Sequence, residues 1–434
     1  MEFFSENEVL IGLILFIAMY IGITLEHLHG IQKEPISLIG GILLWIVVVV
    51  LADMPDIEHD LETAGAEIIE IILFLMAAMT LVEFLDQKGF FELIRVELQR
   101  RSFGDRIQFV VLSLVTFFLS AALDNLTTAL VMLTIAERFF RGENRIIVSA
   151  AIVPNANAGG AWSPIGDVTT IMLWVAGAFT AGQIVSQAFL PSLAHAVVVT
   201  VLLLRHIVDD PTPDSIEDLP ITFTRKDKIL MAVALSCFSL PLIFTQIGLH
   251  AYMGLIFGLG IVWLLNQLLS PRTNYNGDHL TAMEHDIEEL IRKIDHRSLI
   301  FFAGILLGVK ALGTLGVLEE MSQVLLGGDE PGEQRVVIFT YLLGPLSAVV
   351  DNVPLTALAI DILPLETSWQ GSRLALAVGT GGSLLLIGSV AGVVAMGKVA
   401  GLTSGRYFRI ATLPVAMGFM AQTVVFEIQK YLFS

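Results

Sequence analysis

Long apolar runs constrain this fold more than any other feature of the sequence. Runs such as 8–26, 66–86 and 183–204 reach the roughly 18–20 residues that an α-helix needs to cross a bilayer. Hydrophobic residues make up 55% of the chain and charged residues only 15%, whereas soluble domains carry about 25% charged residues. The sequence therefore predicts an all-α polytopic membrane protein, in contact with membrane lipid and without a separate soluble domain.

The start of the chain, its single cysteine and its net charge narrow the class further. The segment MEFFSENEVLIGLILF has no basic n-region and no small-residue cleavage site, so we expect a membrane span there instead of a signal peptide. Cys237 is the only cysteine, which excludes an internal disulfide. The formal net charge of −18 predicts acidic loops, and a saline or alkaline habitat would fit it as well. No basic cluster indicates a nucleic-acid partner.

Two stretches place an Asp-Asn pair inside an apolar run: LSAALDNLTTAL at 119–130 and LSAVVDNVPLTAL at 346–358. On each side of the pair the apolar run is too short to cross a bilayer by itself. Non-helical backbone at membrane depth persists only where protein or a water-filled cavity surrounds it. Each stretch therefore predicts a re-entrant helical hairpin with a polar tip, at about 105–140 and at about 335–364.

The order of these features is the same in the two halves of the chain. Asp351 follows Asp124 by 227 residues, and glycine-rich stretches match at an offset of 222 residues. The sequence therefore predicts an internal duplication. The first repeat covers 1–206, a cytoplasmic linker covers 207–227, and the second repeat covers 228–434. A broken span is expected at about 146–178 and another at about 373–398, with a cytoplasmic loop at 271–297.

Loop charges predict the orientation of the repeats, because Lys and Arg accumulate in cytoplasmic loops. The acidic segments 53–67 and 319–333 contain no Lys or Arg and are expected outside. The remaining loops alternate correctly only if the first hairpin enters from the cytoplasm and the second from outside. Each repeat would then hold five crossings, one re-entrant hairpin and one broken helix, in inverted topology, with both termini outside. Secondary transporters have this architecture.

The hairpin tips carry the chemistry that most needs an explanation. An ionised Asp at mid-membrane costs at least about 2.5–3.5 kcal/mol on insertion scales, so Asp124 and Asp351 should have a bound partner. Carboxylate, amide and hydroxyl oxygens suit hard cations. The tip residues expected to bind a cation or a proton are Asp124, Asn125, Thr127, Thr128, Asp351, Asn352 and Thr356, with Na⁺ at Asp124, Asn125, Asp351 and Asn352. The alternative role is capping of the second hairpin helix, which does not exclude binding.

The broken spans add a second polar group. In IVPNANAGGAWSPIGDVTTIM, residues 152–172, prolines and glycines at Pro154, Gly159, Gly160, Pro164 and Gly166 are expected to interrupt the helix. The candidate ligands there are Asn155, Asn157, Ser163, Asp167, Thr169 and Thr170. The counterpart AVGTGGSLLLIGSVAG, residues 377–392, offers Thr380, Ser383 and Ser389. We call one hairpin tip together with the broken span of the same repeat a half-site. Ser389 stands in the place of Asp167, so the two half-sites are unequal. Close helix packing is the alternative role of these small residues.

Three charged residues lie in apolar helices outside these stretches. Glu83 and Lys310 occupy equivalent repeat positions and could neutralise each other or the site. Snorkelling to an interface is the alternative for Lys310. Glu70 is a candidate for a proton path. Loop histidines such as His250 are expected to be solvated.

The stretches ALDNLTTALVML, NANAGGAWSPIGDVTTIMLW and VVDNVPLTALAI resemble those of the NhaD-type sodium/proton antiporters of the ion-transporter superfamily. The resemblance spans nearly the whole chain. It implies exchange of cytoplasmic Na⁺ or Li⁺ for external H⁺ in a bacterial inner membrane. It also implies two hairpins that meet two broken spans, a homodimer, and no cofactor beyond the transported ions.

Sodium-coupled dicarboxylate carriers of the same superfamily are similar overall and remain the alternative. Their tips carry Ser-Asn-Thr, whereas both tips here begin with an Asp. A carboxylate can exchange a cation for a proton, and two coupled carboxylates would repel an anion. This difference favours cation/proton exchange. No zinc motif, nucleophile elbow or nucleotide loop indicates a membrane enzyme.

Overall fold

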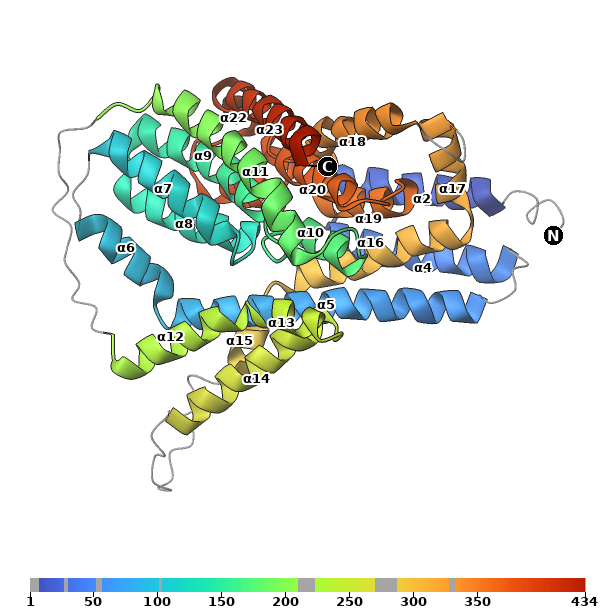
Figure 1. The fold of residues 1–434 in the computed structure, drawn as a ribbon, viewed down its shortest axis with the longest axis horizontal. Coiled ribbons are helices and arrows are strands. Elements are labelled where there is room, and N and C mark those ends of the chain that lie inside the picture. The colour runs from blue at the N-terminus through green and yellow to red at the C-terminus, as the bar shows by residue number, and fades with distance from the viewer. Residues whose placement is uncertain are drawn as a thin grey trace. The chain divides into compact units, whose positions relative to one another are not determined.

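The computed structural model describes residues 8–26, 30–51, 57–100, 104–209, 223–269, 287–327 and 332–433. Within these ranges the regular structure is helical and contains no strand (Figure 1), which confirms the predicted all-α class. Six of the described helices are long and apolar enough to cross a membrane, or seven if α22 (Ser404–Ile410) and α23 (Thr412–Phe433) form one span. The ten crossings expected from the sequence stay a prediction.

The chain divides into two compact units. The first contains Met1–Ile69, Asp105–Val208 and Arg297–Ser434, and the second contains Glu70–Gly104 and Asp209–His296. This division follows contacts in space, whereas the repeats 1–206 and 228–434 follow the order of the sequence. The repeat boundaries therefore stay a prediction.

The second unit is formed by short and medium-length helices. Its elements are the C-terminal part of α5 (Ile57–Gln87), α6 (Phe90–Arg100), α12 (Arg225–Cys237), α13 (Leu240–Gln246), α14 (Ala251–Leu269) and α15 (Ile287–Lys293). Helix α12 begins at a capping box in which Thr224 and Asp227 bond to each other's backbone N–H. Helix α14 packs on α12 and α13. Of the predicted linker 207–227 and loop 271–297, residues 210–222 and 271–286 lie outside the described residues.

The first unit holds both predicted hairpins and both broken spans. Its helices before residue 209 are α2 (Glu8–Thr24), α4 (Lys33–Leu51), α7 (Asp105–Ser120), α8 (Asn125–Phe139), α9 (Gly142–Ala161), α10 (Val168–Val175) and α11 (Ala181–Leu204). Those after residue 295 are α16 (His296–Thr314), α17 (Val317–Ser322), the π-helical η1 (Gln323–Gly327), α18 (Glu333–Ser347), α19 (Asn352–Ile362), α20 (Ser368–Gly381), the 3₁₀ turn η2 (Leu386–Gly388), α21 (Val390–Lys398), α22 and α23.

The core of the first unit is formed by α9 and α20. Residues 146–161 of α9 and 371–381 of α20 are buried without interruption. Helix α7 packs on α8 and α9, α18 packs on α20, and α11 packs along α23 (Figure 1). The polar side chains Asn155, Asn157 and Thr380 of these two helices are thus enclosed by protein.

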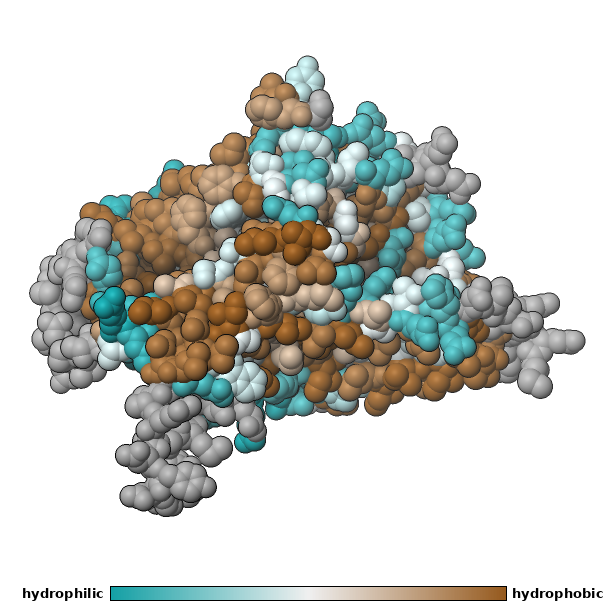
Figure 2. All heavy atoms as spheres, turned by 60° about the horizontal axis from the view of Figure 1, so that its bottom comes forward, coloured by the Kyte–Doolittle hydropathy of each residue, from teal (hydrophilic) through white to brown (hydrophobic). Residues whose placement is uncertain are grey.

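The described surface is rich in apolar side chains. Figure 2 shows hydrophobic residues over much of one face. Large aliphatic residues such as Val50, Leu264 and Leu413 are 69%, 57% and 69% exposed. Soluble monomers rarely expose contiguous apolar patches larger than a few hundred Å². Together with the long apolar helices, this surface agrees with a polytopic membrane protein whose side chains contact lipid.

Candidate functional site

The helical structure is interrupted between α7 and α8 by residues 121–124, which we call the first tip. Asp124 is the N-cap of α8. Its Oδ1 atom accepts a hydrogen bond from the Thr127 backbone N–H at 2.8 Å, and its Oδ2 atom accepts one from the Thr127 hydroxyl at 2.6 Å. The capping role considered from the sequence is therefore present. A carboxylate offers about four acceptor positions, so capping leaves room for a cation.

The helical structure is also interrupted between α18 and α19, by residues 348–351, which we call the second tip. Asp351 is the N-cap of α19 and accepts a hydrogen bond from the Val353 backbone N–H at 3.3 Å. Its Oδ2 atom also lies 3.0 Å from the Lys33 ammonium nitrogen. Lys33 is the first residue of α4, and its ammonium lies 4.2 Å from the centre of the Phe301 ring. Lys33 is not among the candidate site residues named from the sequence, and this ion pair was therefore missed.

The first broken span is interrupted where Pro164 and Gly166 predict a break, but not at the earlier proline and glycines. Helix α9 continues through Pro154, Gly159 and Gly160, and the irregular backbone covers residues 162–167. The expectation that these three residues interrupt the helix was wrong. Pro154 removes one backbone donor, a loss that membrane helices tolerate, and the two glycines permit close packing instead.

Asp167 closes this break as the N-cap of α10. Its Oδ1 atom accepts hydrogen bonds from the Thr169 backbone N–H at 2.9 Å and from the Thr169 hydroxyl at 3.0 Å. The Thr170 hydroxyl donates to the Asp167 carbonyl oxygen at 2.8 Å. The Asp167 residue is only 1% exposed. A carboxylate so deeply buried requires compensation by hydrogen bonds, a proton or a cation.

The first tip and both broken spans are joined by side-chain hydrogen bonds. The Asn125 amide nitrogen donates to Asp167 Oδ2 at 2.6 Å and to Asn157 Oδ1 at 3.1 Å. The Asn157 amide nitrogen donates to the Ser383 hydroxyl at 2.8 Å. Asp124 and Asp351 both lie within electrostatic range of Asp167. We call the connected residues the polar cluster: Asp124, Asn125, Thr127, Asn157, Asp167, Thr169 and Ser383.

The second broken span meets the polar cluster without an acid of its own. Ser389 caps α21 by accepting a hydrogen bond from the Gly392 backbone N–H at 3.3 Å. Thr380 is turned toward α23, since its hydroxyl accepts a hydrogen bond from Gln422 at 3.0 Å. The half-site that contains Ser389 thus carries less negative charge than the half-site that contains Asp167.

Several of the other predicted ligands bond to groups outside the polar cluster, and the Asn155 amide reaches the Thr200 hydroxyl on α11 at 3.4 Å. The Asn155 amide donates to the Ala151 carbonyl at 2.8 Å, and the Thr356 hydroxyl donates to the Asn352 carbonyl at 2.8 Å. The Ser163 hydroxyl accepts a long hydrogen bond of 3.4 Å from the Ile165 backbone N–H. Asn352 is buried, and the buried Thr128 hydroxyl has no partner among the described residues.

The same backbone contacts recur around the two tips. The Ser120 hydroxyl donates to the Ala156 carbonyl at 2.6 Å, and the Ser347 hydroxyl donates to the Val378 carbonyl at 2.9 Å. These two pairs are related by the sequence offsets of the predicted repeats. Likewise, a Cβ atom on Gly159 would overlap the Phe117 carbonyl, and one on Gly381 would overlap the Gly344 carbonyl.

The predicted charged residues outside the tips have partners within their own units. In the first unit, the Lys310 ammonium lies 2.8 Å from Glu67 and 3.7 Å from Asp361. Sequence reasoning missed Asp361, although an acid near the end of the apolar α19 was a visible signal. In the second unit, Glu70 lies 2.7 Å from His250.

Glu83 also lies in the second unit, on α5. It is half-buried and within electrostatic range of Asp86 and Lys293. The roles proposed for Glu70, Glu83 and Lys310 in charge compensation or a proton path stay predictions.

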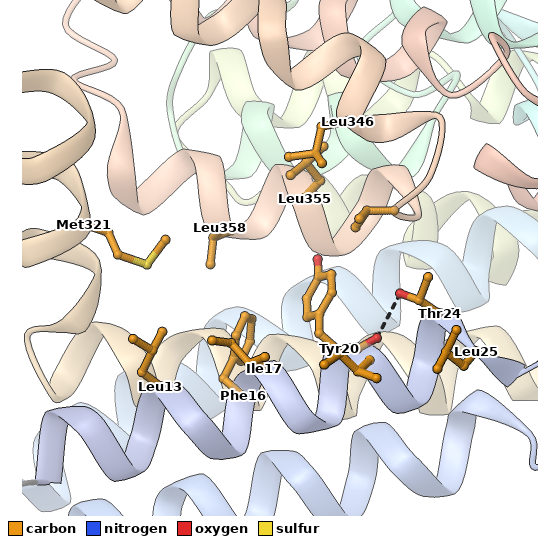
Figure 3. A pocket seen from close by; sticks show the side chains of 12 residues that line it. Leu13, Phe16, Ile17, Tyr20, Thr24, Leu25, Met321, Leu346, Leu355 and Leu358 are labelled. Atoms are coloured by element: carbon orange, nitrogen blue, oxygen red, sulfur yellow. Dashed lines mark hydrogen bonds between the residues drawn. The ribbon is translucent and has the colours of Figure 1, made fainter.

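An apolar cavity of about 440 Å³ lies beside the second tip. Figure 3 shows its lining from α2, with Leu13, Phe16 and Tyr20, and from the later helices, with Leu355 and Leu358. The Tyr20 phenol projects from α2 toward Leu355 (Figure 3), and its buried hydroxyl has no hydrogen-bond partner among the described residues. Tyr20 also lies within electrostatic range of Asp351.

Comparison with known proteins shows the family to which this chain belongs. A family model described as "Citrate transporter", CitMHS, matches residues 20–379. "Sodium/proton antiporter 1" of Arabidopsis thaliana is 34% identical over 91% of this chain and 68% of its own length, and "Sodium/proton antiporter 2" of the same organism is 32% identical over 88% and 91%. "Na(+)/H(+) antiporter NhaD" of Halomonas elongata is 30% identical over 96% of this chain and 87% of its own length. The chain therefore belongs to the CitMHS family and, with these relatives, to the NhaD-type Na⁺/H⁺ antiporters.

Proposed function

We propose that this protein is a secondary transporter, and not an enzyme, that exchanges cytoplasmic Na⁺ or Li⁺ for external H⁺. The observation that carries this proposal is the 2.6 Å hydrogen bond from Asn125 at the first tip to the buried Asp167 carboxylate. This bond holds Asp167 within electrostatic range of Asp124, and each of the two acids lies where a helix is interrupted. Discontinuous helices with acids at their breaks are typical of ion sites in secondary transporters.

Competition at the polar cluster couples the two ions. When Asp124 and Asp167 are ionised, their oxygens and those of the neighbouring amides and hydroxyls bind a hard monovalent cation. When the acids are protonated, the same cluster is neutral, and the protein can return the site to the other side of the membrane without a bound cation. Two neighbouring acids titrate as a coupled pair, so the number of protons exchanged is set by both acids together and not by either one alone. High cytoplasmic pH therefore favours cation loading.

Asn125 is proposed to act as the movable ligand. Its amide nitrogen faces two acceptor oxygens, on Asp167 and Asn157, and so stands between atoms that would bind a cation. An arriving Na⁺ would replace these two donated hydrogen bonds. A half-turn of the amide would then present the Asn125 oxygen to the ion. The second tip, with Asp351 and Asn352, contributes to the charge around this site.

The architecture that we propose for this exchange is a pair of inverted repeats with two re-entrant hairpins. The paired contacts of Ser120 and Ser347 support it, because each serine fixes a broken span on the hairpin of its own repeat. We further propose a bacterial inner membrane location with both termini outside, from the loop charges, and a homodimer, from the family resemblance.

Exchange of cations is favoured over anion uptake by the acids at the site. The matching family model is described as a citrate transporter, but a dicarboxylate approaching this cluster would meet Asp124, Asp167 and Asp351. Like charges at close range cost several kcal/mol in a site from which water is excluded. The relatives named above carry antiporter names over most of this chain.

The decisive experiment uses everted vesicles from a strain without its own antiporters. Vesicles are given an acid interior, and a pH-sensitive dye is followed after addition of NaCl, LiCl or KCl at several pH values. We expect the wild-type protein to respond to Na⁺ or Li⁺ and little to K⁺. Asp124→Asn and Asp167→Asn should each reduce the response to background, because an amide cannot exchange a proton for a cation.

Glu366→Gln is the matched control, since Glu366 is an exposed acid outside the polar cluster. It should retain the wild-type response, and all variants should be compared at equal amounts of folded protein in the membrane. A full Na⁺ response in Asp124→Asn or Asp167→Asn would contradict the site assignment. A wild-type protein with no cation response at any pH would contradict the exchange itself and lead to an assay of sodium-driven dicarboxylate uptake.

A further inference from the structure

The ion pair at the second tip gives Asp351 a cation that belongs to the protein. We propose that the Lys33 ammonium is a tethered counter-cation that occupies the position of a transported ion at Asp351, so that Lys33 sets the number of Na⁺ ions bound. This inference rests on the proposed function. It changes the role expected for Asp351 from a sodium ligand to the partner of an internal cation.

The geometry of the pair is that of a stable interaction. The ammonium nitrogen and Asp351 Oδ2 are 3.0 Å apart, and the two side chains are only 21% and 15% exposed. Limited exposure reduces screening by water and salt. The Phe301 ring, 4.2 Å from the ammonium, adds a second favourable contact. Glu26 and Glu34 lie within electrostatic range and favour the charged amine further.

The charges of the two half-sites support this assignment. The first half-site holds two acids, Asp124 and Asp167, and Asp167 has no basic partner within the described ranges. The second half-site has Ser389 in place of the second acid, and its single acid faces Lys33. A cation bound at the first half-site neutralises negative charge. A cation added at the second half-site would have to compete for the Asp351 carboxylate with the ammonium that already lies 3.0 Å from it.

Tyr20 completes the surroundings of this pair. Its hydroxyl is buried without a partner among the described residues, and it points across the apolar cavity beside the second tip (Figure 3). The cavity lining is almost wholly aliphatic and aromatic, so it supplies little that could solvate Asp351 in the absence of Lys33. Lys33 is thus the main source of positive charge for this carboxylate among the described residues.

The test measures how many Na⁺ ions each polypeptide binds. Purified wild type, Lys33→Met, Lys33→Arg and the double variant Lys33→Met with Asp351→Asn are dialysed to equilibrium against ²²Na⁺ at fixed pH. We expect one Na⁺ per chain for the wild type and for Lys33→Arg. Lys33→Met should bind one more Na⁺, because the Asp351 carboxylate that has lost its ammonium partner recruits a free cation, and the double variant should return to the wild-type number.

A second comparison decides the question if Lys33→Met cannot be recovered as folded protein. Asp351→Asn alone leaves the ammonium without its partner and should lower Na⁺-driven proton movement, whereas the double variant removes both charges and should restore most of it. Failure of the double variant to recover transport, with folded protein present, would mean that Asp351 is required as an ion ligand and would overturn the inference.

The outcomes separate this inference from the proposed function. A wild-type protein that binds Na⁺, together with a folded Lys33→Met variant that binds no additional Na⁺, overturns the role of Lys33 and leaves the exchange intact. A wild-type protein that binds two Na⁺ ions per chain overturns it as well. A wild-type protein that binds no Na⁺ and moves no protons contradicts the exchange, and the inference fails with it.

Discussion

The two helix breaks of the first unit share their backbone contacts and differ in the charges beside them. At both tips an Asp caps the following helix, and a serine before the break bonds to a carbonyl of the neighbouring broken span. Beside the first tip lies Asp167, whereas beside the second lie Ser389 and Lys33. The backbone contacts thus fix where the tips lie, and a few side chains decide what each tip binds. The three predictions below test this division, from the largest expected effect to the smallest.

The shared packing should be needed equally in both halves. Valine at Gly159 or at Gly381 places a branched side chain against a backbone carbonyl that is already in contact. Overpacking of this kind costs about 1–3 kcal/mol, and more when backbone cannot move away. We expect both variants to lose most folded protein, measured by size-exclusion chromatography of detergent extracts.

Gly397→Ala is the control for these valine variants, because a Cβ atom on this helical glycine meets nothing within 4 Å. It should fold as well as the wild type. If only one of the two valine variants is lost, the packing of the two halves is not equivalent.

The difference in charge should appear as a difference in transport. Asp167→Ser gives the first broken span the residue that Ser389 provides at the equivalent place in the second broken span. This variant should abolish Na⁺-driven proton movement, because the cluster loses an acid that can exchange a proton for a cation. Ser389→Ala removes only a capping hydroxyl, which costs about 0.5–2 kcal/mol of stability, and should leave transport close to wild type. Dye recovery in everted vesicles measures both. Equal activity of the two variants would show that the half-sites do not differ in the way described.

The serine contacts should have a small and matched effect. Ser120→Ala and Ser347→Ala each remove one buried hydrogen bond to a carbonyl. Such a loss costs about 1–3 kcal/mol when the acceptor is left unsatisfied. We expect similar decreases in the midpoint of thermal unfolding for the two variants. A large decrease in one variant only would indicate that one tip depends on this contact and the other does not.

The sequence predicted local structure at the site well because local signals determine it. Helix capping was the alternative role that the sequence offered for Asp124 and Asp351, and both residues cap helices in the structure. Asp167, which the sequence offered as a ligand, caps a helix as well. The position of the first break was less predictable. Pro154 and the glycines of α9 are helix breakers by propensity, but tight packing of α9 keeps them helical.

Contacts between distant segments could not be predicted from sequence. The Lys33–Asp351 pair joins residues 318 positions apart, and the Asn157–Ser383 bond joins residues 226 positions apart. Neither residue pair has a local pattern that points to the other. Thr356 was also read as a ligand, yet its hydroxyl bonds to the carbonyl four residues earlier, which is the nearest acceptor in any helix.

The hydrogen bond between Asn157 and Ser383 has a mechanical consequence. It ties together two segments that are also fixed to the first and second tips through the serine contacts. The two tips and the two broken spans are therefore linked in one series of hydrogen bonds, which runs from the first tip through the first and the second broken span to the second tip. We expect a transport cycle that opens the cluster first to one side of the membrane and then to the other to move these four segments together, because relative motion among them would break the hydrogen bonds that join them.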